Sequence, residues 1–209
     1  MLLRSSKARR GVVIALVIFF CFIFLLQSLG AFGANPAVGD QNWAMFHHDL
    51  VHSGSSPSAA PNTNNILWNY TTGDNVVSSP AVVDDKVYIG SDDCKVYCLN
   101  ATTGAKVWSY TTGNIIFCSY PAVVDGKVYI GSNDDKVYCL DAASGEYIWS
   151  YKTDSDVESS PAVANGKVYI GSEDTKVYCL DAATGTYIWS YTTGNGVRSS
   201  LLLLTTKST

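Results

Sequence analysis

The chain has 209 residues, of which 47% are apolar, 12% aromatic and 15% charged. This composition is too apolar for a disordered protein, and 17 glycines with 6 prolines are too few for a collagen-like one. Residues 1–33 hold four basic and no acidic residues, so residues 34–209 carry 10 basic and 18 acidic residues, a net charge of −8. We expect no nucleic-acid binding from so acidic a region, because it cannot replace the counterions of phosphates.

The first 33 residues have the pattern of an export signal. Four basic residues, Arg4, Lys7, Arg9 and Arg10, precede an unbroken apolar run over residues 11–26. Counted to Gly33 the segment has 23 residues, enough to cross a bilayer, while Ala31-Phe32-Gly33 has the small residues of a cleavage site. We therefore expect residues 1–33 to be a signal peptide or a signal-anchor helix, which leaves the remaining chain outside the cytoplasm.

Residues 34–65 form a lead-in segment, and a repeat of about 40 residues follows it. Trp68, Trp108, Trp149 and Trp189 are spaced by 40, 41 and 40 residues. Prolines and glycines recur with the same period, and the one extra residue lies between Gly113 and Pro121, in a connection where insertions are tolerated.

Each repeat predicts four short strands. In the first copy these contain Ser-Pro-Ala-Val at 79–82, Lys-Val-Tyr-Ile-Gly-Ser at 86–91, Lys-Val-Tyr-Cys-Leu at 95–99 and Trp-Ser-Tyr at 108–110. Asp125-Gly126 and Asn165-Gly166 are typical of two-residue hairpin turns, in which both residues need a positive φ. Between the third and fourth strands, a turn opened by Asn or Asp is closed by a glycine, namely Gly104, Gly145 or Gly185.

The strand interiors predict how these units assemble. Both alternating faces of segments such as 87–89 and 96–99 are apolar, so each small sheet must be covered on both sides. Four-stranded units of 40–45 residues stacked face to face are the blades of a β-propeller. We therefore predict an all-β fold, a partial propeller of about three four-stranded antiparallel blades over residues 66–209.

These units resemble the PQQ-like (pyrroloquinoline-quinone-type) propeller repeat, found in quinoprotein alcohol dehydrogenases and in the propeller lipoprotein of outer-membrane assembly. The resemblance covers residues 66–200 and is carried by Ser-Ser-Pro-Ala-Val, Val-Tyr-Cys-Leu-Asp-Ala-Ala-Thr-Gly and Tyr-Ile-Trp-Ser-Tyr. It implies that each closing Trp packs on the Ala-x-x-Thr-Gly turn of the neighbouring blade. A recurring Trp also suits this role because of its large buried area. The implied docking residues are Trp68, Trp108, Trp149, Trp189, Gly104, Gly145 and Gly185.

The resemblance does not extend to catalytic chemistry. Quinoprotein dehydrogenases use an adjacent Cys-Cys disulfide, a Glu/Asn/Asp calcium set and a catalytic Asp around the quinone. The present sequence has no Cys-Cys pair and no residue that stands apart from the repeat for such a role. We therefore expect a non-catalytic binding or scaffold module without cofactor; a fragment of a PQQ- and calcium-dependent dehydrogenase is the alternative.

The remaining candidates for chemistry are cysteines and histidines. Cys98, Cys139 and Cys179 share one repeat position and are expected to be small buried residues, whereas a Cys94–Cys118 disulfide is conceivable outside the cytoplasm. A zinc or copper site is conceivable at the histidine cluster, but we favour a polar lead-in that caps the first blade and predict no metal site. This cluster consists of His47, His48, Asp49 and His52.

The repeat ends before a ring is complete. A lone fourth strand is expected at residues 66–73 and the start of another first strand at 196–204, where Leu201 replaces the expected proline. Because propellers usually need four to eight blades, we expect the chain to be a piece of a longer propeller. Two further explanations are a ring closed by copies of the chain and a ring completed by another polypeptide. Open apolar blade faces would then bind a protein partner or promote self-association.

Overall fold

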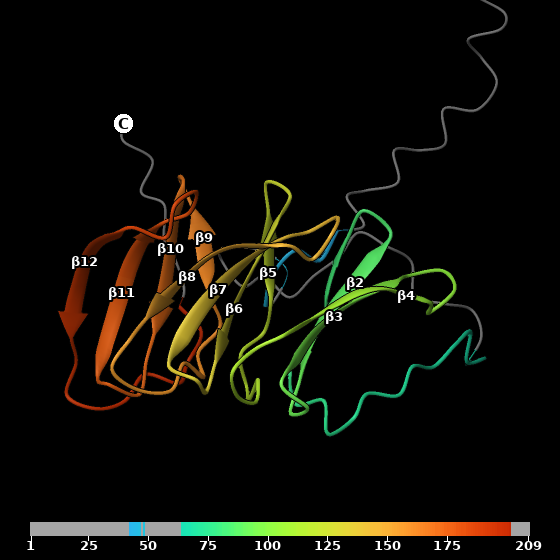
Figure 1. Ribbon diagram of the computed structural model, residues 1–209, viewed down its shortest axis with the longest axis horizontal. Coiled ribbons are helices and arrows are strands. Elements are labelled where there is room, and N and C mark those ends of the chain that lie inside the picture. The colour runs from blue at the N-terminus through green and yellow to red at the C-terminus, as the bar shows by residue number, and fades with distance from the viewer. Residues whose placement is uncertain (1–41, 47, 49–63, 202–209) are drawn as a thin grey trace, which may run out of the picture. The chain divides into compact units, whose positions relative to one another are not determined.

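The computed structural model describes residues 42–46, 48 and 64–201, all of which belong to one compact unit, Asp40–Thr209. Within these residues there are twelve strands and no helix, and the strands form three separate four-stranded antiparallel sheets (Figure 1). The predicted signal or anchor helix at residues 1–33 lies outside the described residues. Among the described ones, no helix has the length and apolar character needed to cross a bilayer.

Each sheet is one copy of the sequence repeat, with its strands in chain order. The first sheet contains β1 (Ala81–Val83), β2 (Lys86–Ser91), β3 (Lys95–Asn100) and β4 (Lys106–Thr111). The second contains β5 (Ala122–Val124), β6 (Lys127–Ser132), β7 (Lys136–Asp141) and β8 (Tyr147–Lys152). The third contains β9 (Ala162–Ala164), β10 (Lys167–Gly171), β11 (Lys176–Asp181) and β12 (Tyr187–Thr192). The prediction of three four-stranded antiparallel blades is confirmed.

The predicted turns form, with the positive φ angles and the aspartate hydrogen bonds that their sequences favour. Asp125 and Gly126 have φ angles of 50° and 69°, as a two-residue hairpin turn between β5 and β6 requires. In the turn after β7, the carboxylate of Asp141 accepts hydrogen bonds from the backbone N–H groups of Ala143 (2.9 Å) and Ser144 (2.8 Å). Gly145 closes that turn with a φ of 75°.

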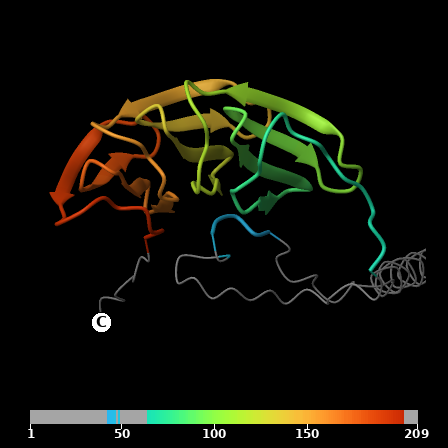
Figure 2. The same ribbon diagram turned by 90° about the horizontal axis from the view of Figure 1, so that it is seen from below.

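The three sheets stand side by side in chain order, and the first strands β1, β5 and β9 of neighbouring sheets contact one another (Figures 1 and 2). One core lies between the first and second sheets and another between the second and third. In β7, Val137, Tyr138, Cys139 and Leu140 are each at most 5% exposed, so both faces of this strand are covered. This covering is what two apolar faces require.

At the ends of the repeat region, the described parts of two predicted strands are not strands. Residues 66–73 are extended without a strand partner in the described structure, and the same holds for residues 196–201. A strand is defined by a ladder of hydrogen bonds to a neighbouring strand, and neither segment has such a ladder among the described residues. The Val197 N–H makes a single backbone hydrogen bond, to the carbonyl oxygen of Ser172 at 3.0 Å. The first strand of each sheet also begins after the proline, at Ala81 rather than Ser79, because Pro80 has no N–H to donate to the ladder.

Candidate functional site

The recurring tryptophans lie between neighbouring blades. The indole Nε1 of Trp108 donates a hydrogen bond to the carbonyl oxygen of Ala142 at 3.1 Å, across the boundary between the first and second sheets. Its ring covers Gly145 so closely that a Cβ there would lie 2.6 Å from the Cδ2 atom of Trp108. Only glycine fits this contact, which also requires a positive φ.

The same arrangement occurs at two other boundaries. Trp149 bonds to Ala182 (3.1 Å) and covers Gly185, and Trp68 bonds to Ala101 (2.8 Å) and covers Gly104. Trp189 has no such turn to cover among the described residues and is 43% exposed, whereas Trp108 is 8% and Trp149 6% exposed.

An aspartate ties each blade to the loop that precedes it. Asp134 Oδ2 accepts hydrogen bonds from the Tyr138 hydroxyl, the Lys136 ammonium (3.2 Å) and the Gly113 N–H (3.0 Å). Burial raises the pKa of Asp134, but these hydrogen bonds outweigh it and hold the pKa below its usual value. Asp93 accepts the corresponding bonds from Tyr97 and Gly73. The ionised aspartate therefore contributes to joining adjacent units.

The three copies carry different residues at one position just before the first strand, and two contacts show which residues are equivalent there. Ile116, Val157 and Val197 each lie against a glycine of the preceding blade, and are thus equivalent. Ser119 and Ser159 are equivalent too, because each hydroxyl accepts a hydrogen bond from the N–H of the blade's own glycine, Gly131 or Gly171.

One residue separates these two anchors in the third copy, Glu158, and two separate them in the second, Phe117 and Cys118. The extra residue of the repeat is therefore in this stretch, and Cys118 has a φ of 55°. The corresponding residues are Val77 in the first copy and Arg198 at the start of the next unit. Valine, cysteine, glutamate and arginine thus occupy one position of the same scaffold.

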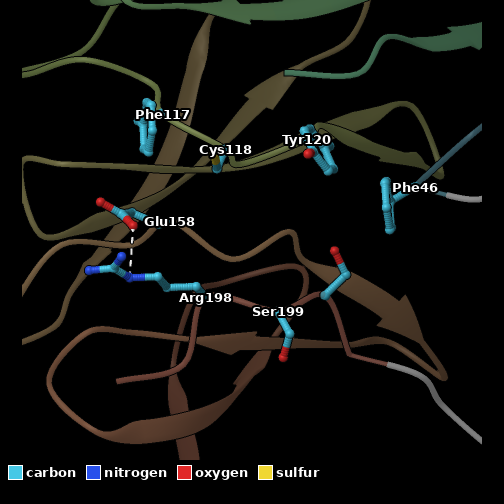
Figure 3. A pocket seen from close by; sticks show the side chains of 8 residues that line it. Phe46, Phe117, Cys118, Tyr120, Glu158, Arg198 and Ser199 are labelled. Atoms are coloured by element: carbon cyan, nitrogen blue, oxygen red, sulfur yellow. Dashed lines mark ion pairs between the residues drawn. The ribbon is translucent and has the colours of Figure 1, made fainter. Parts of the chain in front are cut away.

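Three of these divergent residues, Cys118, Glu158 and Arg198, line an open pocket of about 500 Å³, which we call the first-strand pocket (Figure 3). The residues that line it are Phe46, Phe117, Cys118, Tyr120, Glu158, Arg198, Ser199 and Ser200. Figure 3 shows Glu158 and Arg198 on one side and the aromatic rings of Phe46 and Tyr120 on another. These two rings are stacked, with centroids 4.6 Å apart.

Acidic groups outnumber the single guanidinium on the polar side of the first-strand pocket. Arg198 Nε lies 3.3 Å from Glu158 Oε2 and 3.0 Å from Glu173 Oε1. The Asn133 amide donates to Asp156 Oδ2 (3.1 Å) and to Glu158 Oε1 (3.3 Å). Glu158 itself is only 8% exposed.

The thiol of Cys118 is not an activated nucleophile. Burial raises its pKa, and the negative charges of Glu158 and Asp92 raise it further, against the opposing effect of Arg198. Since the thiolate is the reactive form, this environment slows its chemistry at neutral pH.

The other cysteines and the histidine cluster show no further site in the described structure. Cys94 and Cys118 are both free thiols, so the conceivable disulfide between them is not formed. His48 lies edge-on to Trp43 with ring centroids 5.1 Å apart, while His47, Asp49 and His52 are outside the described residues. Among the residues that the structure describes, no three His, Cys, Asp or Glu side chains gather as a metal site.

The first-strand pocket does not fit the quinone expected of a dehydrogenase. The guanidinium of Arg198 is already held by the carboxylates of Glu158 and Glu173, so binding a carboxylate of pyrroloquinoline quinone would require these ion pairs to break. The adjacent cysteine pair that the resemblance calls for is also missing from the sequence.

Comparison with known proteins identifies the repeat. The family model described as outer membrane protein assembly factor BamB matches residues 27–119 and again residues 113–208. The chain belongs to this BamB-type family of PQQ-like propeller repeats. No curated protein matches the sequence.

Solved structures show the same BamB-type architecture. BamB from Moraxella catarrhalis is 26% identical with a TM-score of 0.54, over 60% of this chain and 39% of that one. The quinohemoprotein alcohol dehydrogenase ADHIIG from Pseudomonas putida HK5 is 27% identical with a TM-score of 0.62, over 72% of this chain and 26% of that one. The quinohemoprotein alcohol dehydrogenase from Comamonas testosteroni, at 23% identity and a TM-score of 0.62, shares the fold. The chain thus spans well under half the length of these proteins.

Sequence reasoning missed the first-strand pocket. It selected the residues that recur in every copy, which lie at blade boundaries, whereas Tyr120, Glu158 and Arg198 occupy positions that vary. The signal that could have found them is the difference between copies: Tyr120 stands where the other copies have Ser79, Ser160 and Ser200.

Proposed function

We propose that this chain is a non-catalytic propeller module that binds a protein partner outside the cytoplasm. The observation that carries the proposal is the match of both halves of the chain to the family model of BamB, an outer membrane protein assembly factor. By this likeness the partner is a component of outer-membrane protein assembly, and residues 1–33 hold the module at a membrane or direct its export.

The first-strand pocket supports this proposal as the contact surface. It lies at the blade ends where the loops enter the first strands, and its residues vary while the blade core repeats. Loops on a rigid scaffold are where binding residues concentrate, because their sequence can change without loss of the fold. The raised pKa of Cys118 gives the pocket no obvious nucleophile.

A photoreactive amino acid at Ser200, in the pocket wall, tests the proposal in the cell that makes the protein. We expect irradiation to give one main adduct with an outer-membrane assembly component, identified by mass spectrometry. The same probe at Asn165, in the exposed β9–β10 turn, is the control and should give little adduct. Equal adducts from both positions, or none from Ser200, would contradict the proposal.

A fragment of a quinoprotein dehydrogenase is the second candidate. It is favoured by the 27% identity to the quinohemoprotein alcohol dehydrogenase over 72% of this chain. Fold alone does not carry activity, and the guanidinium of Arg198 is already paired with Glu158 and Glu173. This candidate predicts stoichiometric binding of quinone in the presence of calcium.

A further inference from the structure

Residues that differ between the copies are not needed for the fold, so they are the ones that can give the first-strand pocket its own chemistry. Because Val77, Glu158 and Arg198 occupy equivalent positions, the scaffold accepts an apolar, an acidic and a basic side chain there. The fold therefore does not require Glu158. Its carboxylate is nevertheless nine-tenths buried, and burying a charge is unfavourable unless partners compensate.

The compensation is incomplete, because acids exceed bases around the pocket. Arg198 is shared between Glu158 and Glu173, and the neutral amide of Asn133 is shared between Glu158 and Asp156. Three carboxylates thus share one guanidinium and one neutral amide. The side chain of Arg198 is itself 70% exposed, so solvent screens its attraction to the carboxylates.

Buried acceptors on the same side also lack donors. Within the described residues, Oδ1 of Asp92 and Oδ1 of Asn133 are buried and have no hydrogen-bond partner. Asp92 acts electrostatically on Cys118, and Asn133 bonds directly to Glu158, so both belong to the surroundings of the pocket. Neither residue lines the pocket itself, so these oxygens add uncompensated negative potential behind its lining.

Aromatic rings on the pocket lining offer a second kind of contact to a cation. Phe46 and Tyr120 stack at 4.6 Å, and Phe117 lies on the same lining. An aromatic face attracts a cation placed over it, and a guanidinium can also stack on it. Phe46 comes from the lead-in segment, and the other two rings come from the second copy, through the extra residue Phe117 and the replacement of serine by Tyr120.

We infer that the first-strand pocket binds a basic side chain, arginine in preference to lysine, presented by an extended segment of the partner protein. The cation lies between the carboxylate of Glu158 and the rings of Phe46 and Tyr120, and its N–H groups donate to that carboxylate. A volume of about 500 Å³ accommodates one long side chain together with the backbone that carries it. The inference rests on the proposed function and names the chemistry of its contact.

Cys118 provides a reporter inside the pocket. The full chain is treated with N-ethylmaleimide at mildly alkaline pH, with and without the peptide acetyl-Gly-Arg-Gly-amide, and the modification rate of each cysteine is measured by mass spectrometry. Cys94 is half-buried and outside the pocket, so its rate is the internal control. At a peptide concentration several times its Kd, we expect the rate at Cys118 to fall about fivefold while that at Cys94 is unchanged.

Matched peptides and variants define the specificity. The isosteric citrulline peptide should give no protection, because it keeps the shape and removes the charge. E158Q should abolish protection, whereas E146Q, an exposed residue of the β7–β8 turn with the same loss of charge, should retain it. Y120S installs the residue of the other copies and so keeps the fold, and it should weaken protection severalfold.

Equal protection by the citrulline peptide, or unchanged protection in E158Q, would overturn the inference. It would also be overturned if Cys118 reacts and the arginine peptide does not slow that reaction. If Cys118 reacts too slowly, saturation-transfer NMR of the same two peptides makes the same comparison. Protection by free arginine but not by the peptide would also refute a polypeptide ligand. A Ser200 photoadduct without arginine protection would leave the proposed function standing and reject only this inference.

Discussion

The indole Nε1 of Trp149 donates a 3.1 Å hydrogen bond to the carbonyl oxygen of Ala182 in the next blade, and its ring covers Gly185. One side chain thus satisfies a backbone acceptor and buries apolar surface between two sheets. Trp108 and Ala142 repeat the relationship one blade earlier. The contacts between blades are therefore encoded in each copy of the repeat.

Replacing Trp149 by alanine should destabilise the protein strongly. Loss of a buried Trp costs about 3–5 kcal/mol through lost burial and the cavity left behind. Trp189→Ala is the matched control, and because Trp189 is 43% exposed its loss should be at most about half as large. Urea unfolding followed by circular dichroism gives both values. Equal losses would show that docking on Gly185 does not stabilise the boundary.

Gly145→Ala should destabilise more than Gly126→Ala, although both glycines have a positive φ. At Gly126 a Cβ meets nothing within 4 Å, so only the backbone conformation is penalised, by about 1–2 kcal/mol. At Gly145 the Cβ would also collide with the ring of Trp108. The midpoints of thermal unfolding compare the two variants, and similar midpoints would contradict a close ring contact.

Stability should fall in acid through the aspartates that join the blades. The pKa of Asp134 is lower in the folded protein than its usual value near 4, so the ionised form is the one that stabilises the fold. Its contribution is complete above about pH 4 and is lost as the pH falls through the folded pKa. Unfolding free energies between neutral and acid pH should show this decline, and Asp134→Asn should flatten it. An unchanged pH dependence in the variant would exclude Asp134 as a source.

The fold could be predicted from the sequence because its determinants recur. Apolar residues on both faces of Val137–Leu140 require cover, and Asp125-Gly126 specifies a hairpin turn by local conformation alone. The pairing of Trp149 with Gly185 was implied by resemblance rather than by spacing. The first-strand pocket could not be predicted in this way. Tyr120, Glu158 and Phe46 are far apart in the sequence and line one pocket only because of the tertiary fold. No local pattern encodes that meeting.

The face of the third sheet should make the chain self-associate. Trp189 is 43% and Tyr191 69% exposed on β12, and adjoining apolar rings at a surface favour association. Trp189→Lys should lower the weight-average sedimentation coefficient of the full chain. Val107→Lys, at a position 47% exposed on β4, is the control and should change it little. Identical sedimentation of both variants would mean that this face is not adhesive.

The proposed function requires that this module binds a polypeptide and not a quinone. Spectrophotometric titration of the full chain with pyrroloquinoline quinone and calcium, combined with an assay of dye-linked alcohol oxidation, tests it most directly. We expect no saturable change in the quinone spectrum and no alcohol-dependent dye reduction, because the sequence lacks the adjacent cysteine pair and Arg198 is already held by Glu158 and Glu173. Binding of one quinone per chain, together with alcohol-dependent dye reduction, would contradict the proposed non-catalytic function.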